Sequence, residues 1–185
     1  MVSRTTPTLT FFPFSGHETT RVTTEASDIA DTGPLSFCQE LLFLHAIRDP
    51  SFRPTISEAV ALEGDIDPFD LLRGLEATRA VHDSLRTTFR WRAGQCFAEV
   101  RTQLPPLAHW VVDGEGISAA DLAGIMGTSV AALDPSVGRT LTSLLVRRGE
   151  RRCLWVLGFH HLVSDGWSQH LYGATFSQAL RNHTP

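Results

Sequence analysis

The chain has 185 residues, enough for one domain with its own hydrophobic core. Its formal net charge of −4 argues against a general nucleic-acid binder, and no apolar run approaches the ~18 residues that a membrane-crossing helix needs. The three cysteines are far apart and form no CxxC pair, which argues against a zinc ribbon or a thioredoxin-type site and fits reduced thiols in the cytoplasm.

The N-terminal residues 1–33 are rich in Thr, Ser and Gly, and they predict a flexible lead-in before the folded part of the chain. Within this segment, residues 9–14 form an aromatic patch that is broken by Pro13. The patch is too short for the apolar core of a secretory signal. It can be a short strand or an aromatic anchor, and the sequence leaves both interpretations open.

A capping box begins the first predicted helix. Ser36 is an N-cap residue, and Gln39 follows it at the spacing that lets the two side chains cap each other's backbone. Asp49-Pro50 ends the helix, because a residue before proline disfavours helical backbone. The apolar positions fall on one helical face, as in an amphipathic helix: Phe37, Leu41, Leu44 and Ile47.

A strand and a second helix follow. Residues 55–63 alternate loosely between apolar and polar side chains and predict a strand that ends at the turn Gly64-Asp65. Asp67-Pro68 begins a helix that runs to about His82, because Asp is a good cap and Pro suits the first helical position. The buried stripe of this helix is predicted to be Leu71, Leu72, Leu75, Thr78 and Val81.

Two hairpins are predicted in the second half of the chain. Residues 85–92 and 95–101 flank Ala93-Gly94, and residues 140–148 and 151–160 flank Gly149-Glu150. Between the hairpins, a helix capped by Ser118 is expected to run through Ala132, and a last helix capped by Asp165 or Ser168 to run to about Leu180. Helices mixed with mostly antiparallel strands predict an α+β layered sandwich.

The segment 160–166, with the sequence HHLVSDG, follows the apolar strand 154–159. Histidine titrates nearest to neutrality and therefore suits proton transfer at cellular pH. Adjacent strand residues point to opposite faces, so His160 and His161 are not expected to act on the same ligand. Two other interpretations are weaker. A zinc site of His160, His161 and Asp165 lacks a further ligand nearby. A Ser-His-Asp hydrolase is also weakly supported, because Ser164 is not in a GxSxG elbow.

The segment 160–166 resembles the HHxxxDG signature of the condensation-domain superfamily, the acyltransferases that join carrier-bound acyl groups in nonribosomal peptide synthesis. Two further segments resemble motifs of this family in the family's order. Residues 34–39 (PLSFCQ) resemble its opening PLSxxQ helix, and residues 82–89 (HDSLRTTF) resemble its RHExLRTxF block, with Val81-His82-Asp83 in place of Arg-His-Glu. The resemblance covers roughly residues 34–180.

The resemblance implies a fold like that of chloramphenicol acetyltransferase, an α/β sandwich with a mostly antiparallel sheet and flanking helices in each lobe. Family members have two such lobes, with the active-site tunnel between them. The motifs of the second lobe, its latch and its floor loop are absent from this sequence. We therefore expect residues 34–185 to be an N-terminal lobe without its C-terminal lobe.

The resemblance also implies roles for five residues. His161 is expected to be catalytic, orienting the attacking amine and accepting its proton, a contribution worth ~10²–10⁴-fold in rate. His160 is expected to be structural. Asp165 is expected to hold the loop through a buried ion pair with Arg86, and it can cap the last helix as well. Gly166 is expected to permit a turn that a side chain would block and to let a carrier arm approach the backbone.

The implied reaction is attack by an amine or hydroxyl on an acyl group that a carrier protein holds through its phosphopantetheine arm. The chain itself would bind no metal or cofactor, and its partners would be an acyl or peptidyl carrier protein and either a complementary C-terminal lobe or a second copy. The alternatives are a non-catalytic carrier-binding module, a truncated remnant, and a wax-ester or polyketide-associated acyltransferase. The arginines around the second hairpin turn are interpreted as a solvated turn or, less simply, a carrier-docking contact: Arg147, Arg148, Arg151 and Arg152.

Overall fold

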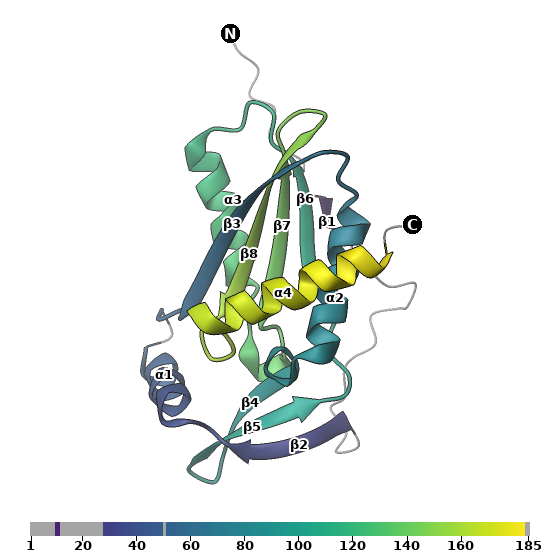
Figure 1. The fold of residues 1–185 in the computed structure, drawn as a ribbon. Coiled ribbons are helices and arrows are strands. Elements are labelled where there is room, and N and C mark those ends of the chain that lie inside the picture. The colour runs from purple at the N-terminus through teal and green to yellow at the C-terminus, as the bar shows by residue number, and fades with distance from the viewer. Residues whose placement is uncertain (1–9, 12–27, 50, 184–185) are drawn as a thin grey trace.

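Two β-sheets and four α-helices make up the described part of the protein, residues 10–11, 28–49 and 51–183 of a computed structural model (Figure 1). The larger sheet has the strand order β1 (Thr10–Phe11), β6 (Ala108–Asp113), β7 (Leu141–Arg147), β8 (Arg152–His160) and β3 (Thr55–Glu63). The smaller sheet has the order β2 (Ile29–Pro34), β5 (Gln95–Arg101) and β4 (Thr87–Arg92). The helices are α1 (Phe37–Arg48), α2 (Pro68–Val81), α3 (Ala119–Ala131) and α4 (Gly166–His183), with 3-10 turns η2 (Asp83–Arg86) and η3 (Pro135–Val137).

Every strand pair of the described residues is antiparallel except β6–β7, so the prediction of an α+β fold with a mostly antiparallel sheet is confirmed. The parallel pair follows from the connection between the two strands. Helix α3 returns the chain to the end of the sheet at which β6 begins, so β7 runs in the same direction as β6. The predicted hairpins β4–β5 and β7–β8 both form.

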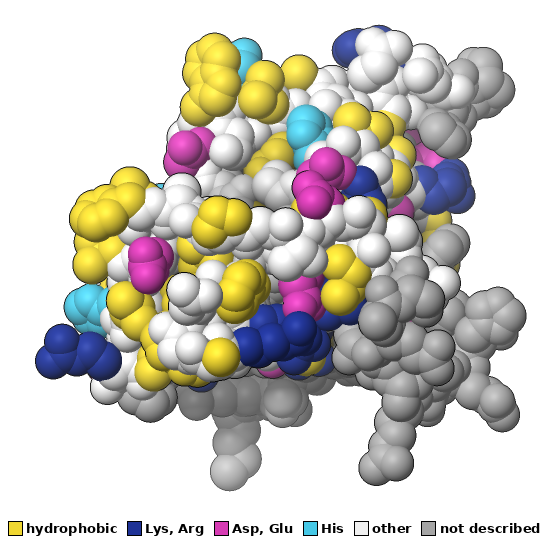
Figure 2. Space-filling view, turned by 90° about the horizontal axis from the view of Figure 1, so that it is seen from below, with side chains coloured by type: hydrophobic (Ala, Val, Ile, Leu, Met, Phe, Trp, Pro, Cys, Tyr) yellow, Lys and Arg dark blue, Asp and Glu magenta, His cyan; other side chains and the backbone are white. Residues whose placement is uncertain are grey.

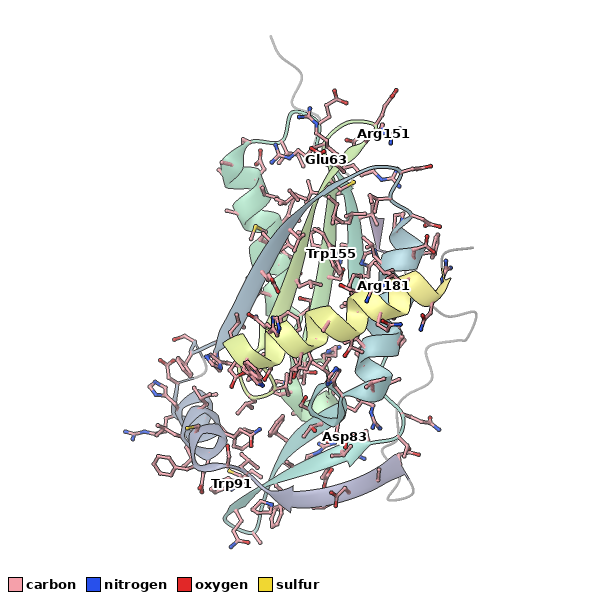
Figure 3. All side chains as sticks on the ribbon, in the orientation of Figure 1. Glu63, Asp83, Trp91, Arg151, Trp155 and Arg181 are labelled. Atoms are coloured by element: carbon pink, nitrogen blue, oxygen red, sulfur yellow. The ribbon has the colours of Figure 1, made fainter. Side chains whose placement is uncertain are left out.

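Helices α2 and α4 cover one face of the larger sheet, as Figure 1 shows. Apolar side chains from these helices and from alternate strand positions form the main core. Trp155 of β8, labelled in Figure 3, lies in this layer, and its ring centroid is 4.8 Å from that of Phe176 on α4. Other buried members of the layer are Leu71, Leu72, Leu75, Leu145, Leu157, Phe159 and Tyr172.

Helix α3 covers the opposite face of the same sheet. Ile125 of α3 packs against the strand positions that point away from the first core. Leu144 and Leu145 illustrate the division, because these adjacent residues of β7 are both fully buried but belong to different cores. Six of the seven residues of β7 are buried, as expected for an inner strand that is covered on both faces.

Two strands lie where the sequence did not predict them. Residues 29–33, assigned to the flexible lead-in, belong to β2, which pairs with β5. Strand β6 was not predicted, because its short apolar run between two prolines and a turn carries little periodic signal. Of the predicted lead-in before residue 28, only Thr10 and Phe11, which form β1, belong to the described residues.

Helix α1 forms with the predicted capping box, but much of its apolar face is exposed. Phe37 is 81% exposed and Leu41 60% exposed, whereas Leu42 and Phe43 pack against the main core. The helix therefore contacts the domain along an edge of its apolar surface and presents the remainder outward. Among the helices of the described ranges, none is long and apolar enough to span a membrane.

Candidate active site

The two histidines of the motif lie where β8 ends, and the neighbouring chain segments hold their backbone from both sides. His160 pairs with Thr55 of β3, and its N–H donates to the carbonyl of Thr140 at 2.9 Å. The N–H of His161 donates to the carbonyl of Pro54 at 2.7 Å. Because the segments before β3 and before β7 both hold this strand end, the position of the histidine pair is fixed by the sheet.

His160 is buried, and its side chain serves the structure. Only 6% of the residue is exposed, and burial lowers the pKa of its imidazole to about 4, with a smaller contribution from His161. The ring is therefore neutral at cellular pH. Its Nδ1 accepts a hydrogen bond from the N–H of Leu162 at 3.3 Å, which ties the ring to the start of the following loop.

His161 has the opposite environment. It is exposed, and its imidazole makes no hydrogen bond or ion pair with any other described residue. The backbone of His161 is fixed while its ring nitrogens stay available to a ligand. This combination is what a general base needs before its substrate arrives.

The loop after the histidines is held by side chains from distant parts of the sequence. Gln39 Nε2 donates to the carbonyl of Leu162 at 2.8 Å, across 123 positions of the chain. The hydroxyl of Tyr172 on α4 donates to the carbonyl of Val163 and lies 2.9 Å from Ser84 Oγ. The first two motif segments, through Gln39 and Ser84, thus converge on the loop of the third.

The sequence signalled only part of this arrangement. Gln39 was predicted to cap helix α1, which it does, since its Oε1 accepts from the N–H of Ser36 at 3.0 Å. Its second bond, to the loop, was not predicted. Tyr172 was not singled out at all, although it is the only tyrosine of the chain and is buried.

Asp165 caps helix α4 and does not pair with Arg86, so the predicted ion pair is wrong. The Asp165 carboxylate accepts from the N–H and the hydroxyl of Ser168, both at 2.7 Å, and these bonds lower its pKa. Arg86 instead forms an ion pair with Asp83 and donates to the carbonyl of Arg101 at 2.8 Å. The physical reason is local: each side chain meets a partner three residues away before it can reach the other.

Gly166 does not have the conformation that was expected of it. Its φ is not in the left-handed region, and a Cβ at this position would meet no atom of the described residues within 4 Å. The first turn of α4 therefore does not itself require glycine here. Ser164 is buried, and within residues 28–49 and 51–183 no cluster of three metal-ligating side chains forms around the histidines or elsewhere.

The comparisons with known proteins identify the family of this chain. The family model described as "Condensation domain" matches residues 29–182. The two sheets and four helices have the chloramphenicol-acetyltransferase-like fold of condensation domains. The chain belongs to the condensation-domain family, which confirms the resemblance seen in the sequence.

Similar curated proteins are large synthetases. The chain is 33% identical over 141 residues to a linear gramicidin synthase of Brevibacillus parabrevis, an alignment that covers 73% of this chain and 3% of that protein. It is 32% identical over 158 residues to chondramide synthase cmdD of Chondromyces crocatus, covering 78% of this chain and 4% of that protein. The chain therefore spans only a few per cent of the length of these relatives.

Similar solved structures show the same fold. The first condensation domain of the calcium-dependent antibiotic synthetase superposes with a TM-score of 0.71 at 21% identity, covering 85% of this chain and 41% of that one. The condensation domain of the Monacolin K polyketide synthase MokA gives 0.70 at 20% identity, covering 85% and 36%. The described fold thus corresponds to less than half of each solved chain.

Proposed function

We propose that this chain supplies the histidine-bearing part of a condensation domain that forms an amide or ester bond in nonribosomal peptide biosynthesis. The observation that carries the proposal is the environment of His161. Its side chain is exposed, while its backbone N–H donates to the carbonyl of Pro54 at 2.7 Å. The family match over residues 29–182 supplies the reaction class.

In the proposed reaction, the donor acyl group is a thioester on the phosphopantetheine arm of a carrier protein. The acceptor amine nitrogen attacks the thioester carbonyl carbon, and a ring nitrogen of His161 takes the proton that the amine loses. The C–S bond then breaks and the proton passes to the departing thiolate. The products are an amide and a free pantetheine thiol, so the histidine ends as it began and the chain itself needs no metal or cofactor.

The loop contacts keep His161 in place during this cycle. His160 is buried and neutral, Gln39 and Tyr172 bind successive loop carbonyls, and Asp165 fixes the first turn of α4. None of these four side chains needs to touch the substrate. We assign them positioning roles, and we assign the catalytic role to His161.

Exposed apolar side chains near the site support a second lobe or a second copy as partner. Phe37 and Leu41 on α1, and Trp167 and Leu171 on α4, are 81%, 60%, 71% and 43% exposed. Figure 2 shows hydrophobic side chains gathered at the edge of the molecule where α1 lies. In this proposal residues 34–185 act as an N-terminal lobe, and the partner completes a tunnel over His161.

The proposed location is the cytoplasm. The three cysteines are free thiols, and they differ in exposure from exposed Cys38 to buried Cys96. Free thiols of this kind are typical of a reducing compartment.

The test is a condensation assay with the complete protein that contains this chain, an acyl-loaded carrier donor and an amine acceptor. His161→Ala should lower the rate by ~10²–10⁴-fold while the unfolding midpoint and carrier binding stay unchanged, because the ring is exposed and supports no other side chain. If His161→Ala forms product as fast as the unaltered protein, the catalytic assignment fails. If carrier binding persists but no turnover is seen even with His161 present, the chain is a carrier-binding module.

A further inference from the structure

The loop after β8 begins as a tight turn that carries His161. The N–H of Val163 donates to the carbonyl of His160 at 3.0 Å, which closes a four-residue turn with His161 and Leu162 at its two central positions. His160 is fixed in the sheet by its pairing with β3, so the geometry of the turn depends on what holds Val163. A group that holds Val163 therefore acts on the position of His161 through the backbone.

Tyr172 of α4 holds Val163 at its carbonyl, which accepts from the tyrosine hydroxyl. The ring of Tyr172 is 5% exposed and is packed on two sides. Its centroid lies 4.9 Å from that of the His82 imidazole and 5.8 Å from that of the Phe159 ring. Because these contacts fix the ring, the remaining freedom of the phenol is the direction in which its hydroxyl hydrogen points.

Ser84 determines that direction. Its Oγ lies 2.9 Å from the hydroxyl oxygen of Tyr172. Tyr172 has a single hydroxyl hydrogen and donates it to Val163, so the Ser84 hydroxyl must be the donor to the tyrosine oxygen. A hydroxyl that accepts one hydrogen bond becomes a better donor in the next, because linked hydrogen bonds polarise one another. The Ser84 bond therefore strengthens the bond that holds Val163.

Burial keeps the middle group of this relay protonated. It raises the pKa of the Tyr172 phenol above its ordinary value, and the hydrogen bond from Ser84 opposes this shift with a smaller contribution. The phenol is thus a donor to the Val163 carbonyl at any pH near neutrality. A phenolate would instead face the carbonyl oxygen with a negative charge.

We infer that Ser84 is a positioning residue for His161 and acts through the hydroxyl of Tyr172. The link to turnover rests on the proposed function, in which His161 is catalytic. Ser84 occupies the position that the RHExLRTxF motif leaves unspecified, and Tyr172 lies outside all three motif segments. The relay from Ser84 to Val163 is therefore a feature of this chain that the family motifs do not specify.

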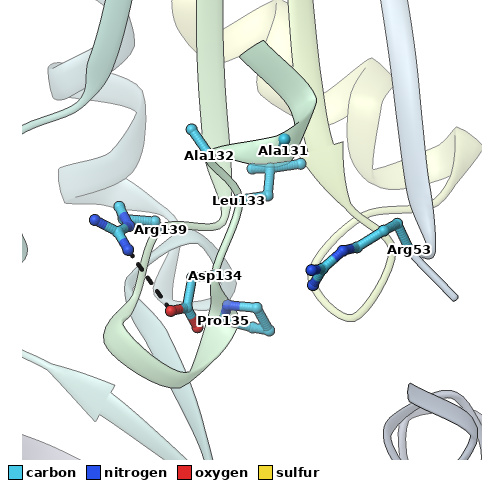
Figure 4. Close-up of a pocket in the computed structure, with 7 residues that line it drawn as sticks. All are labelled: Arg53, Ala131, Ala132, Leu133, Asp134, Pro135 and Arg139. Carbon is cyan, nitrogen blue, oxygen red and sulfur yellow. Dashed lines mark ion pairs between the residues drawn. The ribbon is translucent and has the colours of Figure 1, made fainter. Parts of the chain in front are cut away.

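The pocket on the α3 side of the sheet does not contribute to this support. It has a volume of about 360 Å³ and lies between the end of α3 and Arg53 (Figure 4). Its carboxylate, on Asp134, accepts hydrogen bonds from Ser136 and lies 3.6 Å from the guanidinium of Arg139. Val163, by contrast, is buried in the main core with Tyr172, so the turn is supported from the α4 side.

A double-mutant cycle on turnover tests the inference in the complete protein that contains this chain. Ser84→Ala should lower kcat about fivefold with little change in KM, because a small displacement of His161 affects the reaction more than binding. Tyr172→Phe should lower kcat about tenfold or more. In the Tyr172→Phe background, Ser84→Ala should have no further effect, because the hydroxyl through which Ser84 acts is gone. Ser84→Thr keeps a hydroxyl and should restore kcat.

Thr175→Val is the matched control. Thr175 Oγ1 lies 2.8 Å from His82 Nε2, so this pair also joins the turn after α2 to α4, but neither side chain makes a described hydrogen bond to the loop. The variant should lower the unfolding midpoint, as Ser84→Ala does, and leave kcat unchanged. An unaltered kcat in Ser84→Ala, equal losses of kcat in Ser84→Ala and Thr175→Val, or additive losses in the double-mutant cycle would each overturn the inference.

Hydrogen exchange separates this inference from the proposed function. Ser84→Ala should speed the exchange of the Val163 amide about fivefold, whichever residue is catalytic, because the turn opens more often. Faster exchange together with full activity of His161→Ala would remove the catalytic assignment and leave the support of the turn standing. Loss of activity in His161→Ala, with unaltered exchange and kcat in Ser84→Ala, would do the reverse.

Discussion

At the scale of single residues, adjacent histidines show how burial assigns different roles to the same side chain. His160 and His161 share a strand end, but one ring is enclosed by the protein and the other is exposed. Burial lowers the pKa of His160 to about 4, which makes it a neutral hydrogen-bond acceptor. The exposed ring has no hydrogen-bond partner among the described residues, as the proposed role of His161 in proton transfer requires.

A second histidine is buried as deeply, and burial again lowers its pKa. His109 of β6 is 1% exposed, and burial lowers its pKa to about 4. Its Nδ1 lies 2.8 Å from Ser143 Oγ, and this oxygen accepts from the indole N–H of Trp155 at 2.9 Å. The Nε2 of His109 is buried and has no hydrogen-bond partner among the described residues, so a second proton on the ring would add an unpaired charge to the core.

These two histidines predict a loss of stability in mild acid. Their folded pKa values lie below the unfolded value of about 6.5, so the unfolded chain binds more protons as the pH falls from about 6.5 to about 4. Each should contribute a loss on the order of 3 kcal/mol over that window, and none above it. Urea unfolding at pH 7.5 and pH 4.5 measures the difference.

His109→Gln provides the control for this prediction. Replacing one of the two titrating rings should remove about half of the pH-dependent loss, whatever the substitution costs at pH 7.5. A free energy of unfolding that stays constant between pH 6.5 and pH 4.5 would contradict the assignment of both rings as buried and neutral.

At the scale of elements, the close crossing of α2 and α4 depends on a glycine. A Cβ at Gly74 would lie 2.6 Å from Cε2 of Phe176, and that ring is already packed against Trp155. The helices can approach over the sheet only because this position has no side chain. This crossing also places α4, and with it Tyr172 and the loop after β8.

Gly74→Ala should therefore destabilise the protein despite the better helix propensity of alanine. Alanine normally gains roughly 0.5–1 kcal/mol over glycine within a helix, but overpacking typically costs about 1–3 kcal/mol. We expect a net loss of about 1 kcal/mol or more in urea unfolding. Gly124→Ala in α3, where a Cβ meets no described atom within 4 Å, should instead stabilise the protein.

At the scale of the whole molecule, the site is assembled from segments that are far apart in the sequence. Gln39 links helix α1 to the loop at Leu162, and Ser84 links the turn after α2 to Tyr172. The sheet and helices bring the three motif segments next to one another. Their order in the sequence therefore signals the family, while their contacts arise from the fold.

Gln39→Glu tests the link between α1 and the catalytic loop. The carboxylate can still accept from the N–H of Ser36, but it cannot donate to the carbonyl of Leu162 and would face it with a negative charge. We expect a loss of about 1–3 kcal/mol in stability together with a lower kcat. Ser36→Ala removes the cap but not the loop contact, so it should reduce stability by about 1 kcal/mol and leave kcat unchanged. Equal effects of the two variants on kcat would show that the loop contact has no positioning role.

The sequence by itself determined the elements whose signals are local. The capping pairs at Ser36 and Asp67 and the turn at Ala93-Gly94 all act over a few residues, and each element that they predict is present. The motif 160–166 indicated the family and the strand-end histidine for the same reason, since it is a contiguous pattern. The division between buried His160 and exposed His161 followed from the two-residue period of a strand.

Only the tertiary structure decided which partners the side chains meet. Asp165 and Arg86 each bond locally, and Tyr172 holds the loop after the histidines. Contacts between distant segments depend on how helices cross and on which strands pair, and no local spacing encodes either. The same limit applies to the exposed face of α1, since periodicity shows that a helix has an apolar side but not what covers it.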